Sequence, residues 1–444
     1  MLNINLIRTK PEWVRQQLLK RGYQTDFTDL LGFDIEKRKA ITKNEVLRAK
    51  RNTVSADIAK IKRGGAGSNY SSPEAQNRLV DRLVAEMRNI GDKIANGDKK
   101  IAKLDAKIFD LIAALPNIPA DDVAAGGKEK NRVIQSFGNK PKFSFSPKNH
   151  VDLCTSLGLI DYQRAAKISG TKTWVYTGVG AMLEWALLNY FVDFHIRNKY
   201  TFVMVPHLLN YQSGVTAGQF PKFADDVFIT NFDKDIKQSR FLLPTAETAL
   251  INLHRDEIIP ADKLPIKYAG YSPCYRKEAG SYRTDERGMV RGFQFNKVEM
   301  FIFCKAADTA KFFDELVKNA EKLVEGLGLH YQTVALAAGD CASAMAKTYD
   351  IEVFIPSMDG YKEVSSISAC HDYQARRGNI RTQRDTGPGY TSEKEFVHTL
   401  NASGLATSRL IPAIVEQFQN ADGSVTVPEV LHKYMHGVKV IHVK

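Results

Sequence analysis

Apolar residues between positions 27 and 115 recur at the spacing of two long helices that pack against each other. In the first half these residues lie seven positions apart and are Phe33, Ala40, Leu47, Val54 and Ile61. In the second half three- and four-residue steps alternate, broken only at Gly97, through Val80, Leu83, Met87, Ile90, Ile94, Ile101, Leu104, Ile108, Leu111 and Leu115. Such spacing keeps one apolar stripe of each helix facing a partner helix.

A turn-forming stretch separates the two apolar repeats. Residues 63–72, Arg-Gly-Gly-Ala-Gly-Ser-Asn-Tyr-Ser-Ser, are rich in glycine and serine, a composition that disfavours a helix. The sequence therefore predicts an antiparallel helical hairpin with arms of about 30 to 40 residues, roughly 45 to 60 Å long. The prolines of the stretch 116–119 would end the second helix. We predict an N-terminal domain over 1–115 with this arm, a polar linker over 116–144 and a second domain over 145–444.

The chain beyond residue 145 alternates helix-like and strand-like patterns. We predict helices over 181–198, 308–326 and 405–418, and strands over 202–206, 267–275, 292–303 and 351–355. Strands in hairpin order with helices between them indicate an α+β domain on an antiparallel sheet. The sequence contains neither a Gly-x-Gly-x-x-Gly turn after a strand nor a Gly-x-x-x-x-Gly-Lys-Ser/Thr loop, so it lacks the signatures of Rossmann and P-loop nucleotide sites.

The chain carries excess positive charge, with 62 Lys and Arg against 50 Asp and Glu in 444 residues and a formal net charge of +12. An acidic partner such as nucleic acid is expected, because Lys and Arg release the counterions condensed on phosphates. Residues 34–63 alone hold ten Lys and Arg against four Asp and Glu. Taken by itself, a solvated coiled coil with a charged exterior is the simpler interpretation of this arm.

Cysteine usage and hydropathy indicate a cytoplasmic protein. The five cysteines are dispersed with no paired spacing, which is typical of reduced thiols. The first residues lack the apolar core of a signal peptide. No stretch approaches the roughly 20 apolar residues of a membrane span, so we expect no membrane partner.

The densest group of polar candidates lies where two apolar, strand-like stretches flank an arginine-rich loop. Arg276 and Glu278 are two residues apart, and a strand would place both on one face of the sheet. Arg291, Phe295 and Glu299 are separated by even intervals and would also share a face. Together they offer guanidinium groups for phosphates, a ring for a base and carboxylates for an amine. A salt-bridged surface hairpin is the alternative, but charges crowded among apolar strand residues cost free energy unless they are paired or used.

These residues resemble motif 2 of seryl-tRNA synthetases, a class II aminoacyl-tRNA synthetase family, in the start Arg-x-Glu-Ala-Gly and the finish Arg-Gly-Met-Val-Arg-x-x-Gln-Phe-x-Lys-Val-Glu. Further stretches resemble family segments in the family's order: Pro116–Pro119 after the helical arm, Gly180–Pro206 as motif 1, Leu243–Glu247 as a Thr-Ala-Glu loop, Glu363–Arg377 before motif 3, and His398–Arg409 as motif 3. The resemblance implies a class II catalytic domain on an antiparallel sheet, preceded by a long antiparallel coiled-coil hairpin.

The resemblance implies an ATP site built from these motifs. Arg276 would hold the α-phosphate and the serine carboxylate, and Glu278 would contact the nucleotide. Phe295 would stack on adenine, with Arg409 on the opposite face and reaching the γ-phosphate, while Arg291 would steady the bent triphosphate. The implied catalytic residues are Arg276, Glu278, Arg291 and Arg409, and the ATP-binding set adds Lys277, Phe295, Glu363, Val364, Ser365 and Ser366. Glu363 and Ser366 would hold Mg²⁺ together with ATP.

The resemblance also implies an L-serine pocket lined by Thr245, Ala246, Glu247, Glu299, Asn401 and Ser403. Glu299 would pair with the serine ammonium. A site that hydrogen-bonds the serine hydroxyl rejects alanine far better than apolar fit can. The serine carboxylate would attack the α-phosphorus in line, and the adenylate would pass to a 3′-terminal tRNA hydroxyl without any protein nucleophile.

The resemblance implies L-serine and serine tRNA as partners, with selenocysteine tRNA as a further acceptor to consider. It also implies a homodimer, since motif 1 forms the class II dimer interface. The helical arm would then bind tRNA, which reverses the simpler interpretation of its charge. Two alternatives stay open. A paralogue that passes its adenylate to a non-tRNA acceptor would leave the basic arm without a purpose, and an inactive tRNA-binding relic would not need the complete set of charged site residues.

Three positions depart from the family's pattern. Ala369 replaces the usual Asn after Ser-x-Ser, and Phe293 replaces the usual His before the motif 2 Gln. Ser408 stands where motif 3 usually has a small residue or Pro before its Arg. Ala369 lies close to the pocket residues in sequence, so we expect it to reshape the serine pocket.

Overall fold

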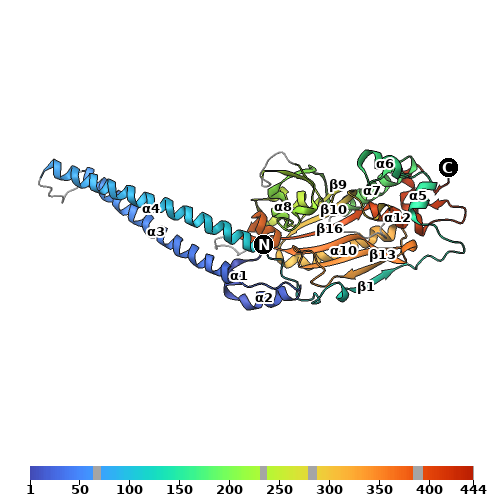
Figure 1. Cartoon of the computed structure of the whole chain (residues 1–444), viewed down its shortest axis with the longest axis horizontal. Coiled ribbons are helices and arrows are strands. Elements are labelled where there is room, and N and C mark those ends of the chain that lie inside the picture. The colour runs from blue at the N-terminus through green and yellow to red at the C-terminus, as the bar shows by residue number, and fades with distance from the viewer. Residues whose placement is uncertain (64–71, 231–237, 279–287, 384–393, 444) are drawn as a thin grey trace. The chain divides into compact units, whose positions relative to one another are not determined.

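The computed structural model describes residues 1–63, 72–230, 238–278, 288–383 and 394–443. The chain forms two compact units (Figure 1). One unit comprises residues 4–11 and 25–115, and the other comprises residues 1–3, 12–24 and 116–444.

The smaller unit is a helical hairpin, as predicted. Helices α3 (Thr28–Lys62) and α4 (Pro73–Ala114) lie side by side and antiparallel, and ion pairs such as Arg48–Asp98 and Lys50–Glu86 join them (Figure 1). Ser72 caps the N-terminus of helix α4, since its hydroxyl accepts from the Ala75 amide at 3.2 Å. The predicted turn falls mostly on residues 64–71, outside the described part of the chain. Helix α1 (Ile4–Thr9) belongs to the same unit.

A buried polar contact fills the break in the apolar stripe at Gly97. The Asn44 side chain of α3 is buried, and its amide donates to the Ile94 carbonyl at 3.1 Å and to Asp98 Oδ1 at 2.8 Å. A Cβ atom on Gly97 would lie 2.0 Å from Asn44 Oδ1. Gly97 therefore makes room for Asn44, and a buried asparagine of this kind fixes the register of two helices.

The prediction that Leu111 lies on the apolar stripe is wrong. Leu111 is 37% exposed, whereas Ile112 is 5% exposed. The buried residues at this end of the helix include Leu104, Ile108 and Ile112, which lie four residues apart. A straight helix has 3.6 residues per turn, so its buried stripe drifts away from an alternating three-four pattern.

The larger unit is built on an eight-stranded sheet. In spatial order its strands are β1 (Arg132–Phe137), β11 (Tyr331–Ala335), β12 (Lys347–Ile355), β13 (Gly360–His371), β16 (His398–Ala406), β10 (Gln294–Cys304), β9 (Ile266–Tyr275) and β4 (Thr201–Met204). Neighbouring strands pair antiparallel, except for the parallel pair β4 and β9. The predicted α+β class with a mostly antiparallel sheet is confirmed.

Side chains alternate along each strand, so one face of this sheet packs against helices and the opposite face carries the candidate site. Helices α7 (Val179–Arg197), α10 (Thr309–Gly326) and α12 (Thr407–Gln417) pack on one face, where Val298, Met300 and Ile302 of β10 join the main core (Figure 1). The alternate residues of β10 point to the opposite face. There Phe301 belongs to a second apolar cluster, and Glu299 faces the candidate site.

Smaller elements complete the larger unit. The remaining α-helices are α2 (Pro11–Leu19), whose first residue falls in the hairpin unit, α5 (His150–Ser156), α6 (Tyr162–Ser169), α8 (Tyr211–Ala217), α9 (Glu247–Leu250) and α11 (Tyr373–Gly378). The short strands are β2 (Ile160–Asp161), β3 (Val175–Tyr176), β5 (Leu208–Asn210), β6 (Ile229–Thr230), β7 (Arg240–Leu242), β8 (Ile258–Ile259), β14 (Arg381–Gln383), β15 (Lys394–Phe396), β17 (Val425–Thr426) and β18 (Val440–Ile441). No helix among the described residues combines the length and apolar character needed to cross a membrane.

The structure differs from the predicted polar linker over 116–144. Strand β1 lies within this stretch and pairs with β11. Asn117 is buried and donates to the carbonyls of Ala344 at 2.9 Å and Cys370 at 2.8 Å. All six residues of β1 are exposed, so the strand has no buried face to produce the apolar–polar alternation by which a strand is predicted from sequence.

Candidate active site

Two neighbouring strands supply the floor of a buried polar pocket. Glu299 of β10 lies directly opposite Ser403 of β16, and Asn401 lies opposite Phe301. Opposed residues of paired strands point to the same face of a sheet. Glu299, Asn401 and Ser403 are all buried, so the strands bring together three of the predicted serine-binding residues.

A loop brings the second wall of the pocket. Thr245 and Ala246 precede the short helix α9, which begins at Glu247, and all three residues are buried. Lys297 of β10 joins this wall to the floor, since its Nζ lies 2.8 Å from Thr245 Oγ1 and 2.5 Å from Glu299 Oε2. Sequence reasoning missed Lys297, although its even spacing from Phe295 and Glu299 places it on the same face.

Glu247 is a buried carboxylate held by two amides. Its Oε1 accepts from Gln374 Nε2 at 2.6 Å and from Asn401 Nδ2 at 3.2 Å. Burial, followed by repulsion from Glu299, raises the pKa of Glu247 to about 7, while the hydrogen bond from Gln374 and the charges of Lys297 and Arg276 oppose the rise. Gln374 was not predicted as a site residue. It lies inside the stretch before motif 3, where only the tertiary fold points it at the pocket.

Two cavities meet at Arg276. The first has a volume of about 260 Å³ and is lined by Thr245, Glu247 and Arg276 together with residues 217–219 and 342–345, among others. The second is smaller, about 70 Å³, and its lining contains Arg276, Glu278, Arg291, Phe295, Lys297, Glu363, Val364, Ser403 and Arg409. Of the predicted serine-binding residues, Thr245 and Glu247 line the larger cavity and Ser403 lines the smaller one, together with most of the predicted ATP-binding residues. Ala246, Glu299 and Asn401 are not among the described residues that line either cavity, and Arg276 borders both.

Charged groups in the smaller cavity pair with one another. Arg291 Nε lies 2.6 Å from Glu278 Oε2, and Arg409 Nη1 lies 3.7 Å from Glu363 Oε2. The Arg276 guanidinium lies over the Phe295 ring, 5.2 Å from its centroid. A nucleotide that stacks on Phe295 and binds the arginines through its phosphates would exchange these internal contacts for its own.

The prediction that Arg276 and Glu278 share one face of a strand is wrong. Strand β9 ends at Tyr275, and Glu278 adopts a φ of 53°. Both side chains still line the smaller cavity, because the chain turns after the strand. Lys277, Ser365 and Ser366 are not among the described residues that line either cavity. Ser365 is buried and its hydroxyl donates to the Ser403 carbonyl at 2.5 Å.

Helix α12 carries Arg409 into the site near its N-terminus. Arg409 Nε donates to the Val290 carbonyl at 3.1 Å, and Nη1 donates to the Glu363 carbonyl at 2.7 Å. Val290 belongs to the 3₁₀ turn η5 (Gly288–Val290), which leads into β10. Arg409 thus ties α12 to two other segments that line the smaller cavity, η5 and β13.

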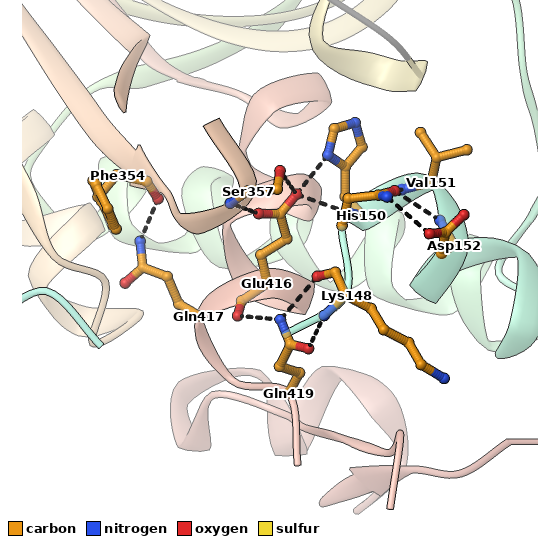
Figure 2. A network of polar contacts seen from close by, with 10 residues as sticks. Lys148, His150, Val151, Asp152, Phe354, Ser357, Glu416, Gln417 and Gln419 are labelled. Atoms are coloured by element: carbon orange, nitrogen blue, oxygen red, sulfur yellow. Dashed lines mark hydrogen bonds and ion pairs between the residues drawn. The ribbon is translucent and has the colours of Figure 1, made fainter. Parts of the chain in front are cut away.

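The opposite end of α12 is anchored by a buried carboxylate (Figure 2). Glu416 Oε1 accepts from the His150 amide at 2.8 Å and from Ser357 Oγ at 2.8 Å, and it lies 2.7 Å from His150 Nδ1. Oε2 accepts from the Ser357 amide at 2.7 Å. Gly288 packs against His150, since a Cβ there would lie 2.9 Å from Nε2. One helix therefore holds η5 twice, through Arg409 and through Glu416 and His150.

A carboxylate that the sequence did not single out lies beside the predicted metal ligands. Asp350 of β12 is opposite Ser366 of β13, and its Oδ1 is buried with no hydrogen-bond partner among the described residues. Burial, and then the charge of Glu363, raises the pKa of Asp350 well above its usual range. The described residues contain no group of three or more His, Cys, Asp or Glu that could hold a metal by themselves.

Two family models match the chain. The model of the seryl-tRNA synthetase N-terminal domain matches residues 1–119, and that of the tRNA synthetase class II core domain (G, H, P, S and T) matches residues 229–418. A Clostridium acetobutylicum protein named serine–tRNA ligase 2 is 52% identical over 98% of this chain and 99% of its own length. The chain belongs to the seryl-tRNA synthetase family.

Solved seryl-tRNA synthetases share this fold along the whole chain. The Pyrococcus horikoshii enzyme, solved with ATP, superposes with a TM-score of 0.86 at 33% identity and covers 100% of both chains. The cytoplasmic serine–tRNA ligase of Naegleria fowleri, solved with AMP, gives a TM-score of 0.82 at 26% identity and covers 100% of this chain and 99% of its own. The predicted fold, a class II core with a long helical arm, is confirmed.

The departures from the seryl-tRNA synthetase pattern fall in different surroundings. Ala369 is buried in the main core between the sheet and its helices, on the face opposite to the pocket. The expectation that it reshapes the pocket is therefore wrong, because a side chain on that face does not line the site. Phe293 packs edge-on against Phe228, with centroids 5.9 Å apart. Ser408 lines the smaller cavity directly.

Proposed function

We infer that the protein activates L-serine with ATP and transfers it to the 3′ end of serine tRNA. One observation carries this conclusion: two buried carboxylates, Glu247 and Glu299, lie next to an arginine-lined cavity, and Arg276 borders both spaces. Carboxylates suit the serine ammonium, and guanidinium groups suit phosphates. Family membership and full-length similarity to serine–tRNA ligases support the same activity.

The position of Arg276 suits the first chemical step. The serine carboxylate oxygen bonds to the α-phosphorus, the bond from that phosphorus to the bridging oxygen breaks, and pyrophosphate leaves with the electron pair. Arg276 would neutralise charge on the attacking carboxylate and the α-phosphate together, while Arg291 and Arg409 would hold the departing phosphates. No side chain has to act as nucleophile, so positioning and charge neutralisation provide the acceleration.

We propose that the nucleotide occupies the smaller cavity. Phe295 would stack on adenine once Arg276 exchanges its contact with the ring for a phosphate, and Glu278 would accept from the base edge. Lys277, Ser365 and the backbone around Val364 lie next to these groups in sequence and would complete the ATP site. The ATP and AMP complexes of the Pyrococcus and Naegleria relatives support a nucleotide at this fold position.

The residues at the β12–β13 hairpin fit a Mg²⁺ ion that arrives with ATP. Oxygen ligands are the ones Mg²⁺ prefers, and the ion usually binds one or two carboxylates plus substrate phosphates. Glu363 and Ser366 would hold it, and the buried Asp350 adds a carboxylate whose Oδ1 has no hydrogen-bond partner among the described residues. When bound, the ion would neutralise charge on the phosphates.

The remaining pocket residues would recognise serine. Glu299 would pair with the ammonium, and Ser403, directly across from it, would bond the serine hydroxyl. Thr245, Ala246 and Glu247 would close the second wall, and Asn401 would keep Glu247 oriented through its 3.2 Å hydrogen bond.

The helical unit is proposed to bind tRNA. Helix α3 carries nine of the ten Lys and Arg of residues 34–63. Phosphate contacts would read the shape of serine tRNA, with selenocysteine tRNA as a further acceptor to test. We place the tRNA-binding residues in 25–115 and the chemistry in the larger unit.

A homodimer is proposed from motif 1. Helix α7 and the edge strand β4 expose the large apolar side chains Trp185, Ile196, Phe202 and Met204. Exposed apolar patches of this kind mark protein interfaces. Light scattering at micromolar concentration should give twice the chain mass, and a monomer would contradict the proposal. A cytoplasmic location is proposed because all five cysteines are unpaired and buried.

Pyrophosphate exchange with a panel of amino acids, with and without tRNA, tests the proposed function. We expect serine-dependent exchange without tRNA and transfer to serine tRNA when it is added. Exchange without transfer to tRNA would indicate a different acceptor. The absence of exchange with every amino acid would indicate a tRNA-binding protein without activity.

A further inference from the structure

A lysine lies at the centre of the serine pocket, between its two walls. Lys297 is only 5% exposed, and its ammonium contacts Glu299 of its own strand and Thr245 of the facing loop. Glu299 is 2% exposed, so this ion pair is almost fully removed from water. Breaking such a pair by removing one partner leaves an uncompensated buried charge.

Two acidic groups in the pocket need this positive charge. Glu247 and Glu299 are both buried, and burial followed by the charge of Glu299 raises the pKa of Glu247. The charged or titratable groups that act on this part of the site are Glu247, Glu299, Lys297, Arg276, Cys274 of β9 and Cys370 of β13. Lys297 and Arg276 are the cations among them, and Arg276 is also needed at the phosphates. Lys297 alone combines a charge in the pocket with bonds to both walls.

We infer that Lys297 is a positioning residue that holds Glu299 and Thr245 in the serine-binding arrangement before serine arrives. The inference rests on the proposed serine activation and adds a residue to which the motif resemblance gave no role. A fixed carboxylate and a fixed hydroxyl lower the cost of ordering the pocket around a small substrate. Of the two cavities, Lys297 lines the smaller one, proposed for the nucleotide, but its ammonium contacts Glu299 and Thr245 of the proposed serine site. We therefore expect its removal to affect serine binding first and the coupling of serine to ATP next.

The test measures pyrophosphate exchange of Lys297→Met and Lys297→Arg with serine and ATP varied separately. We expect Lys297→Met to raise the KM for serine at least tenfold while the KM for ATP stays within about twofold of the parent, because the ion pair faces serine. Lys267→Met is the matched control. Its ammonium pairs with Glu315 at 2.8 Å between β9 and α10, away from both cavities, so we expect no change in either KM.

A pH profile separates positioning from a purely structural role. Lys297 lowers the pKa of Glu247, so its loss should move the acidic limb of kcat/KM for serine to higher pH. Lys297→Arg keeps the charge but changes the geometry, so we expect a raised KM for serine with the limb at the parental pH. A lysine that only supported folding would lower the melting temperature without moving the limb.

Each outcome decides the inference. If the parent enzyme activates serine, and Lys297→Met leaves both the KM for serine and the acidic limb of the kcat/KM profile unchanged, the inference about Lys297 is overturned. If Lys297→Met does not fold, Lys297→Arg decides, since a parental KM for serine in that variant also overturns it. A parent protein without serine-dependent exchange would instead refute the proposed function, so the two failures are distinguishable.

Discussion

The helical hairpin and the catalytic pocket both bury polar groups, but they use them differently. In the hairpin, Asn44 reaches a backbone carbonyl and Asp98, and Asp34 pairs with Arg8 at 2.8 Å. In the pocket, burial and then repulsion from Glu299 raise the pKa of Glu247 to about 7. In the hairpin, the buried polar groups satisfy one another and fix the register of the two helices. In the pocket, two carboxylates are held close together, an arrangement that a cationic ligand would stabilise. This difference separates a structural site from a functional one.

Removing the arm should have the largest effect. Replacing residues 34–105 by a short Gly/Ser linker should abolish charging of serine tRNA and leave pyrophosphate exchange intact, because the hairpin buries its stripe mainly against itself. Tight binding of the intact protein to tRNA should fall steeply with salt, as phosphate contacts require. A deletion variant that charges tRNA at the parental rate would show that the arm is structural.

Arg276→Ala should lower the pyrophosphate exchange rate by about two orders of magnitude or more, the scale of a lost transition-state charge stabiliser. Arg132→Ala on the exposed strand β1 is the control and should leave the rate unchanged. Near-parental exchange in Arg276→Ala would contradict the assignment of both cavities, because this residue is the one they share.

Ser403→Ala should weaken the preference for serine over alanine by about tenfold or more, since a buried partner for the hydroxyl is what makes the analogue costly to bind. The KM for ATP should change less. If alanine is rejected as before, the hydroxyl partner is Thr245 or Asn401, and the same measurement on those variants will identify it.

The pH dependence of serine activation should follow Glu247. A carboxyl group is charged above its pKa, so the ammonium of serine should bind better as pH rises through about 7. We expect kcat/KM for serine to increase between pH 6 and pH 8 while ATP binding alone does not follow the same curve. A flat serine profile over this range would indicate that Glu247 does not change its protonation state between pH 6 and pH 8.

The smallest effect is expected in the hairpin, where two glycines form a matched pair. Gly97→Ala would displace Asn44 from its two hydrogen bonds and should destabilise the folded protein by about 1 to 3 kcal/mol. Gly91→Ala meets nothing within 4 Å and should stabilise helix α4 by about 0.5 to 1 kcal/mol. Thermal unfolding of the two variants should therefore shift in opposite directions. Equal shifts in the unfolding temperature of the two variants would mean that the hydrogen bonds of Asn44 do not require a glycine at position 97.

The sequence by itself predicted the hairpin, four of the eight strands of the main sheet (β4, β9, β10 and β12) and most of the residues that line the smaller cavity. Heptad spacing predicted α3 and α4 because a helix that packs on a partner repeats its contacts every three or four residues. Motif order predicted Glu299, Arg409 and Thr245 because their segments resemble the family even without knowledge of their positions. The even spacing from Phe295 to Glu299 also held, since β10 pairs with β9 without a register shift here, although its pairing with β16 shifts between Lys297 and Glu299.

Tertiary structure decided which of these residues touch and which others join them. Lys297 and Gln374 contact the pocket only after strands far apart in sequence pair, and Asp350 joins Glu363 and Ser366 only through the β12–β13 hairpin. The face on which Ala369 lies depends on the register of β13 against its neighbours. Local spacing fixes the direction of a side chain relative to its own strand, whereas the partner it meets depends on contacts that the chain forms over hundreds of residues.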